Sequence, residues 1–235
     1  MNSAAVIEHA LLTRHSCRAF RSAPVPRATI ERLLWLAARS ASNANCQPWQ
    51  VHVLHGAAKQ ALTNDLLASY DHTGPPGEAE YDYQPGPEEW PEPFRSRRRR
   101  FGEGLYRGTL GIAADDTEGR RAHHRRNYDF FGAPVGLVIT VSRGPRDSAL
   151  IDAGLFLSSL MIAARALDLH TCAQASFLDF APVLRRHLVI PEDHLIVCAM
   201  ALGYADDTHR LRDHRTTREP VTSFATFYSE FNTGT

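Results

Sequence analysis

The segment Arg14-His15-Ser16-Cys17-Arg18-Ala19-Phe20 places two arginines and a serine at alternate positions near the start of the chain. In an extended backbone, residues two apart project to the same side, so Arg14, Ser16 and Arg18 would share one face. A guanidinium group binds phosphate oxygens in bidentate fashion, and a hydroxyl adds a neutral donor. The pattern predicts a compact anion clamp, although a solvated basic loop has the same local sequence.

A second polar cluster, Ser42-Asn43-Ala44-Asn45-Cys46-Gln47-Pro48-Trp49, follows about 25 residues later. Because Pro48 follows it, Gln47 is expected to have an extended backbone. Carboxamides both donate and accept hydrogen bonds, which suits the edge of a heterocyclic ring that does the same. The alternative is a loop whose Ser and Asn side chains cap its own backbone.

Hydrophobic periodicity predicts the regular elements around these clusters. Helices are expected at residues 4–13, from about 26 to 40, and at 59–70, 95–106, 116–131, 148–167 and 180–187, and strands at 49–54, 134–141 and 194–202. Six prolines between residues 71 and 94 exclude a regular core element there. We therefore expect a single domain over residues 1–235, with a lid or insertion at about 71–131.

Two features predict a second copy of the chain as partner. The helix at 148–167 is apolar nearly all round, so it needs cover on every side, either inside the core or against a second subunit. The final segment, 206–235, is predicted to be an extended tail that wraps around the partner. Its aromatic anchors are Phe224, Phe227, Tyr228 and Phe231.

Bulk composition narrows the function classes. The 26 Lys and Arg residues equal the 26 Asp and Glu residues, so no global positive field favours nucleic acid or a membrane surface as partner. The four cysteines are widely spaced and are expected to be reduced thiols in a cytoplasmic protein. None of the twelve histidines lies in a metal-binding pattern, so no metal is expected.

Taken in order, the two polar clusters resemble the signature of the nitroreductase family of FMN enzymes. The resemblance continues through Phe131-Gly132-Ala133-Pro134-Val135, Gly154-Leu155, Thr171-Cys172-Ala173-Gln174-Ala175-Ser176, Ala201-Leu202-Gly203-Tyr204 and Arg215-Thr216-Thr217-Arg218-Glu219-Pro220. The insertion, with Trp90, the four arginines from Arg97 to Arg100, Tyr106 and Asn127, is most similar to the nitrobenzoate-reductase-like branch. The resemblance implies an α+β fold: a three-layer sandwich with a central antiparallel or mixed sheet, helices on both sides, and a domain-exchanged homodimer.

The resemblance also implies a role for individual residues in binding FMN. Arg14, His15 and Ser16, with Arg215 and Arg218, would hold the ribityl phosphate end. Arg18 would lie at the pyrimidine end and tune the redox chemistry, and no other catalytic side chain is expected. Ring or ribityl contacts would come from Ala41, Ser42, Asn45 and Gln47, some of them from the opposite subunit, and from Gln174, Ala175 and Ser176. Ala41 replaces the usual proline, and Gln174-Ala175 replaces the usual Glu-Gly.

The activity implied is ping-pong transfer of hydride from NADH or NADPH, through FMN, to a small aromatic acceptor such as a nitroaromatic or a quinone. Two alternatives remain open. The same scaffold would also support a reductive dehalogenase or a dehydrogenase. A flavin-binding protein without turnover would have the same binding residues.

Overall fold

The computed structural model describes residues 3–72, 74–75 and 79–228. In this part of the chain, strands β1 (Trp49–His55), β2 (Val135–Ser142), β3 (His170–Gln174) and β4 (His194–Gly203) form an antiparallel sheet in the order β1-β2-β4-β3. Val138 of β2 pairs with His52 of β1 and with Ala199 of β4. β3 is an edge strand, because it pairs only with β4 among the described strands.

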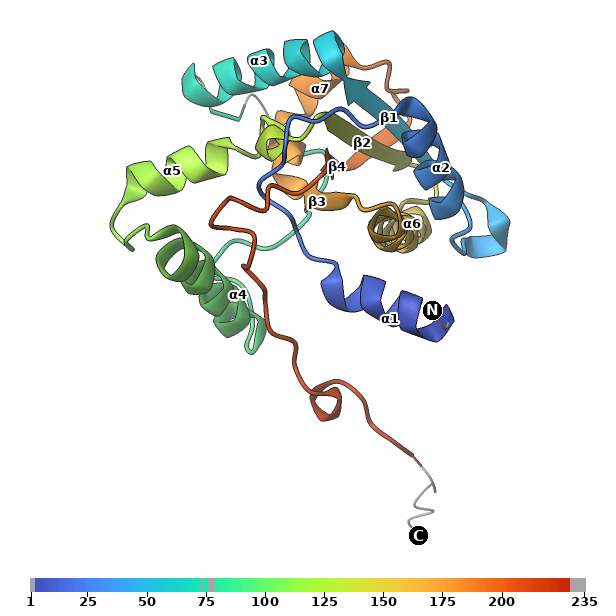
Figure 1. The fold of residues 1–235 in the computed structure, drawn as a ribbon. Helices are drawn as coiled ribbons and strands as arrows, with labels where there is room; N and C mark the ends of the chain where they lie inside the picture. Colours follow the sequence, from blue (N-terminus) through green and yellow to red (C-terminus); the bar gives the residue numbers. More distant parts are fainter. Residues whose placement is uncertain (1–2, 73, 76–78, 229–235) are drawn as a thin grey trace.

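Two helical layers cover the sheet. Figure 1 shows α3 and α7 on one side of the strands and α6 on the other. The helices are α1 (Ser3–Thr13), α2 (Arg27–Ala37), α3 (Gly56–His72), α4 (Phe94–Gly102), α5 (Thr117–Arg125), α6 (Arg146–Ala166) and α7 (Ala181–His187). Shorter helical segments are Asn43–Asn45, Glu103–Leu110, Phe130–Gly132, Ala175–Phe180 and Val221–Ser223.

Most of the buried apolar residues fall into two large clusters, one on each face of the sheet, and a third, small cluster joins Leu105, Leu110 and Leu211. Val138 belongs to the cluster beneath α3 and α7, whereas Leu137 and Ile139 belong to the cluster beneath α2 and α6. This alternation arises because successive side chains of a strand point to opposite faces. Gly136 is required where β2 meets the first cluster, since a Cβ there would lie 2.6 Å from the Phe130 ring. The predicted three-layer α+β fold is confirmed.

The structure corrects several element boundaries. β3 was not among the expected strands, because His170-Thr171-Cys172-Ala173-Gln174 is short and lacks a clear apolar alternation. α3 begins at Gly56 rather than residue 59. The helix expected over 116–131 ends at Arg125, because Asp129 caps a separate turn at Phe130–Gly132 through its side chain.

The predicted lid is fixed to the sheet close to its start. Glu80 accepts hydrogen bonds from Arg185 Nε at 2.6 Å and from the backbone N–H of Ile196 at 3.0 Å. Tyr81 donates to the carbonyl of Val197 at 3.3 Å. α4 and α5 then extend away from the sheet (Figure 1). The insertion returns to the core at its end, where Tyr128, Phe130 and Phe131 are buried.

α6 and the tail carry the apolar surface left uncovered in one chain. By length and composition α6 would be apolar enough to cross a membrane, but it packs on the sheet through residues such as Phe156 and Leu160. Its outer residues Ile151 and Leu155 are exposed. The tail runs away from the body (Figure 1), with Phe224 and Phe227 exposed. The fourth predicted anchor, Phe231, lies outside the described residues.

Candidate functional site

Six of the predicted cofactor residues line one cavity of about 550 Å³ between α1, α4 and the C-terminal tail. They are Arg14, His15, Ser16, Arg18, Arg215 and Arg218. Leu11, Leu12, Phe101, His214 and Thr216 complete the lining. We call this the arginine cavity. Residues about 200 positions apart in the chain therefore meet at one site.

Edge-strand pairing positions the N-terminal half of this cavity. Ser16 forms a parallel bridge with Thr171 of β3, and the Cys17 N–H donates to the Thr171 carbonyl at 2.9 Å. Shortly after Cys17 in the same segment, the Ala19 carbonyl accepts a hydrogen bond from the Asp206 N–H at 3.0 Å. The chain leaving β4 is thus held against residues 14–20, which directs the tail arginines toward Arg14.

The guanidinium groups of the cavity lack an anionic partner among the described residues. Arg218 donates only to Thr216 and Thr217 oxygens, at 2.7 to 3.2 Å. Arg215 donates only to the carbonyls of Arg212 and His214. Burial, and secondly the charge of Arg218, lowers the pKa of Arg14. A doubly charged phosphate would relieve this repulsion between like charges, so the cavity fits the phosphate of FMN.

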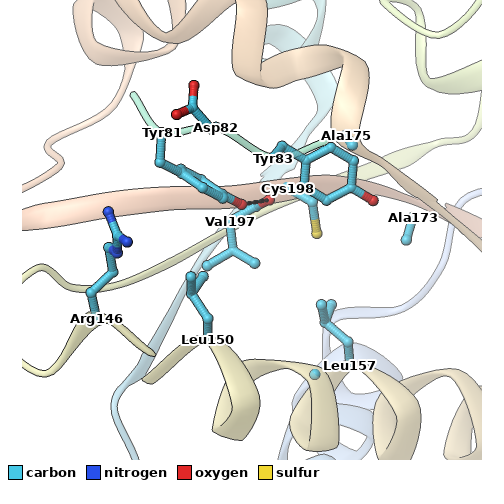
Figure 2. A pocket seen from close by; sticks show the side chains of 11 residues that line it. Tyr81, Asp82, Tyr83, Arg146, Leu150, Leu157, Ala173, Ala175, Val197 and Cys198 are labelled. Carbon is cyan, nitrogen blue, oxygen red and sulfur yellow. Dashed lines mark hydrogen bonds between the residues drawn. The ribbon is translucent and has the colours of Figure 1, made fainter. Parts of the chain in front are cut away.

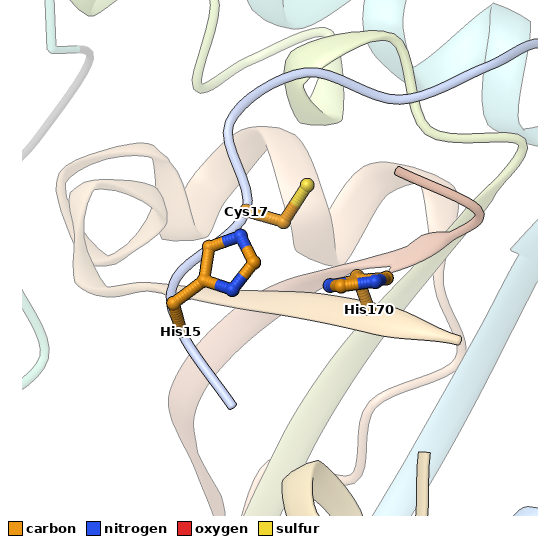
Figure 3. Close-up of side chains that lie close together, drawn as sticks. All are labelled: His15, Cys17 and His170. Carbon is orange, nitrogen blue, oxygen red and sulfur yellow. The ribbon is translucent and has the colours of Figure 1, made fainter. Parts of the chain in front are cut away.

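His15, Cys17 and His170 lie close together beside this cavity (Figure 3), and their ligand atoms are all within 4.8 Å of one another. Their chemistry opposes a cation. Arg165 Nη1 lies 2.8 Å from His170 Nε2 and uses its lone pair. Burial raises the pKa of the Cys17 thiol to about 11. Nearby arginines further disfavour a second positive charge, so we assign no metal to this cluster.

The predicted ring-contacting loop lies apart from the arginine cavity. Ala41, Asn45 and Gln47 are exposed, and Ser42 is half-buried. The buried carboxylate of Asp152 on α6 accepts from the Asn43 N–H at 3.1 Å, and Ser42 Oγ accepts from the Gln47 N–H at 3.0 Å. Within one chain, this loop presents its carboxamides outward rather than toward residues 14–18.

Three loop residues have backbone conformations that L-amino acids seldom adopt. Ala44, Asn45 and Gln47 have φ values of 47°, 57° and 47°, so the extended backbone expected for Gln47 before Pro48 is wrong. Such conformations persist only where the surroundings hold them, and they are common at ligand sites. Together, the Asp152 contact and the Ser42 cap set the loop shape before any ligand is present.

The third predicted group, Gln174, Ala175 and Ser176, spans the end of β3 and the start of the helical segment after it. Gln174 is buried, and its Nε2 donates to the Asn127 carbonyl at 2.7 Å. Ser176 Oγ is also buried and has no hydrogen-bond partner in the described structure. Ala175 lines a separate cavity of about 470 Å³ between α6 and β4, beside Tyr81 and Leu157 (Figure 2). The Nε2 group of Gln174 is therefore occupied, whereas its Oε1 is buried and accepts no hydrogen bond within the described structure.

Sequence reasoning missed Phe101, His214 and Asn127 as site residues. Phe101 and His214 line the arginine cavity, and Arg18 Cζ lies 5.5 Å from the centre of the Phe101 ring. Asn127 binds Gln174 through its backbone, and the sequence places it only within the insertion. No local pattern marks these residues, because their neighbours at the site come from distant segments.

Comparison with known proteins shows which family the chain belongs to. The model of the Nitroreductase family matches residues 11–204. The chain belongs to the nitroreductase family. The matched range includes residues 14–18, the loop at 41–47 and β3, and it ends before the tail arginines.

Two similar members of this family are 4-nitrobenzoate reductases. This family member is 51% identical over 214 residues to a 4-nitrobenzoate reductase of Nocardioides sp. (strain LMS-CY), covering 91% of this chain and 86% of the relative. It is 36% identical to a 4-nitrobenzoate reductase of Pseudomonas putida, covering 92% of each chain. The predicted nitrobenzoate-reductase-like branch is confirmed.

A solved structure agrees with the fold. The crystal structure of the FMN and NADPH-dependent nitroreductase NfnB from sphigopyxis sp. strain HMH superposes with a TM-score of 0.89. The two chains are 33% identical, over 95% of this chain and 99% of the other. The prediction of an oxidoreductase of nitroreductase type is confirmed.

Proposed function

We propose that this protein binds FMN in the arginine cavity and uses electrons from NADPH to reduce the nitro group of a small aromatic compound such as 4-nitrobenzoate. The observation that carries the proposal is the convergence of Arg14 and Arg218 on one cavity with no anionic partner among the described residues. The named relatives support the substrate class, and the NfnB structure supports both the cofactor and the donor.

The roles of the chain's own residues follow from their positions. Arg14, Ser16 and Arg218 bind the phosphate, and Arg215 with His15 adds donors beside it. Bound FMN supplies the two-electron chemistry between nucleotide and acceptor. Arg18 lies against Phe101 in the lining of the same cavity, and its charge would stabilise a negative charge developing on the flavin pyrimidine.

We also propose that the active unit is a homodimer. Loop 41–47 displays its carboxamides away from the arginine cavity of its own chain, so a second copy is needed to bring such a loop to the flavin. Exposed Ile151 and Leu155 on α6 would be buried in that contact. The tail aromatics would then wrap around the partner, and the insertion at about 71–131 would cover the acceptor as a lid.

Anaerobic absorbance spectroscopy tests the proposed activity. Purified protein should be yellow, should bleach on addition of NADPH, and should regain its colour when 4-nitrobenzoate is added. A yellow protein inert to both NADPH and NADH would point to a flavin-binding protein without turnover. Recolouring by a halogenated aromatic but by no nitroaromatic would favour the dehalogenase alternative.

Sedimentation velocity tests the dimer separately. The expected mass is twice the 26.2 kDa of one chain. Replacing Ile151 and Leu155 by Asp should shift the protein toward the monomer and lower its flavin content, because two charges would be buried at the interface. A monomeric wild-type protein that still reduces 4-nitrobenzoate would contradict the dimer and leave the activity intact.

We further place the protein in the cytoplasm, with no nucleic-acid or membrane partner.

A further inference from the structure

A second cationic cavity, of about 400 Å³, lies next to the arginine cavity. One wall is α4, with Arg97 and Arg100, and the other is the tail from His214 to Glu219. The two cavities share Phe101, His214, Arg215, Thr216 and Arg218. A ligand in this α4 cavity would therefore lie beside the phosphate end of bound FMN.

The charges in the α4 cavity are not balanced. Arg97 Nε and Arg100 Nη1 lie 3.4 and 3.6 Å from the same oxygen, Glu219 Oε1. Both distances exceed the roughly 2.7–2.9 Å of a strong charge-assisted hydrogen bond. Glu219 is the single acidic residue that lines the cavity, against four arginines. The guanidinium groups of Arg97 and Arg100 thus remain available to a more highly charged anion.

Access and position favour a phosphate on a long ligand. The side chains of Arg97 and Arg100 are 38% and 65% exposed, so a ligand can reach them from solvent. A nitrobenzoate whose nitro group meets the flavin ring is too short to reach beyond the FMN phosphate as well. A dinucleotide is extended, and its adenosine end lies far from its reactive nicotinamide.

We propose that Arg97 and Arg100 bind the 2′-phosphate of NADPH in the α4 cavity and so give the enzyme its preference for NADPH over NADH. The inference rests on the proposed function, because it concerns the electron donor of that reaction. Recognition of a phosphate by two forked guanidinium groups is strong, and NADH has only a hydroxyl at that position.

The test compares two variants of one helix. Arg97→Gln/Arg100→Gln removes the two cavity arginines, whereas the control, Arg99→Gln, removes an exposed charge of α4 that does not line the cavity. The double variant should lower kcat/KM for NADPH by about tenfold or more, through KM, and change that for NADH by less than about threefold. The control should keep the wild-type ratio of the two.

A binding measurement gives a readout independent of turnover. In calorimetry on the FMN-loaded protein, adenosine 2′,5′-bisphosphate should bind the wild type more tightly than AMP, and the double variant should lose that difference. Equal losses for NADPH and NADH would overturn the proposal. A raised KM for 4-nitrobenzoate with unchanged nucleotide selectivity would assign the cavity to the substrate carboxylate instead. In either case, continued reduction of 4-nitrobenzoate would leave the proposed function standing.

Discussion

Residues 14–18 and the loop at 41–47 are both predicted to bind FMN, yet the fold positions them by different means. The first segment is completed by long-range contacts: it pairs with β3 and meets arginines of the tail. The second is shaped locally, by Ser42 and by Asp152 on α6, and stays outside the arginine cavity. One half of the site is therefore electrostatically incomplete without a ligand, whereas the other half is pre-shaped and exposed.

The largest expected effect concerns the incomplete half. Arg14→Ala/Arg218→Ala should weaken FMN binding by roughly 2–5 kcal/mol, because two charged donors to a dianion are lost. Fluorescence titration of the flavin-free protein with FMN measures this change. The control, Arg39→Ala/Arg186→Ala, removes two exposed arginines outside the cavity and should bind FMN normally. Unchanged affinity in the double variant would overturn the assignment of the phosphate to these arginines.

The next effect concerns the anchor of the pre-shaped half. Asp152→Ala should lower the free energy of unfolding by about 1.5–3 kcal/mol, because the charged acceptor of the Asn43 N–H is lost. Asp152→Asn is the matched control, since it keeps one carbonyl oxygen at that place. Urea unfolding measures the stability, and amide hydrogen exchange at Asn43 should accelerate in the alanine variant. Slow exchange there would mean that the loop does not depend on α6.

Low pH should destabilise the fold through His170, which lies beside the arginine cavity and not at the loop 41–47. Burial, and secondly Arg165, lowers the pKa of His170 to about 4, and His15, Asp207 and Arg215 also face this imidazole. The unfolded chain takes up a proton below about pH 6.5, whereas the folded chain stays neutral until about pH 4. The stability that the folded protein has with a neutral His170 is therefore fully present above about pH 6.5, and it is lost as the pH falls toward 4.

His170→Gln should remove that acid sensitivity. In flavin-free protein, the variant should lose about 1–2 kcal/mol less stability than the wild type between pH 8 and pH 4.5, after allowance for the half-exposed ring. Urea midpoints at the two pH values measure the difference. His9→Gln, on the exposed surface of α1, is the control and should follow the wild type. Identical slopes for wild type and His170→Gln would contradict the role of His170.

The smallest effect probes the backbone of the loop. Ala44 has a φ of 47°, which costs an L-residue about 1–2 kcal/mol relative to glycine. Ala44→Gly relieves that strain but adds backbone entropy to the unfolded chain, so the free energy of unfolding should change by less than about 1 kcal/mol. Ala153→Gly in α6 should cost at least about 1 kcal/mol, since it lacks the compensating relief. Thermal unfolding compares the two, and equal losses would show that Ala44 is not strained.

Much of the architecture was accessible from local patterns. The apolar runs predicted β2, β4 and α6, because a strand or helix that is covered on several sides leaves a near-continuous hydrophobic signal. β3 gave no such signal, since it is a five-residue edge strand whose Ala173 is exposed. Its existence depends on pairing with β4, which is a tertiary contact.

The site residues also differ in whether a local sequence pattern could predict them. Arg14, Ser16 and Arg18 could be recognised as an anion-binding pattern, since their alternation in an extended segment is a local property. The pairing of Arg14 with Arg218 required the family resemblance, because periodicity does not connect residues so distant in the chain. Phe101 and His214 escaped prediction for the same reason.

The sequence by itself determined which residues carry positive charge, where the chain bends and which segments must be buried, because these depend on side-chain chemistry and short-range backbone sterics. Tertiary structure alone decided that the tail crosses residues 14–20, that Asp152 holds the Asn43 amide, and that α4 lies against Glu219. These contacts join segments far apart in the chain, and their geometry is fixed only when the two faces of the sheet are packed.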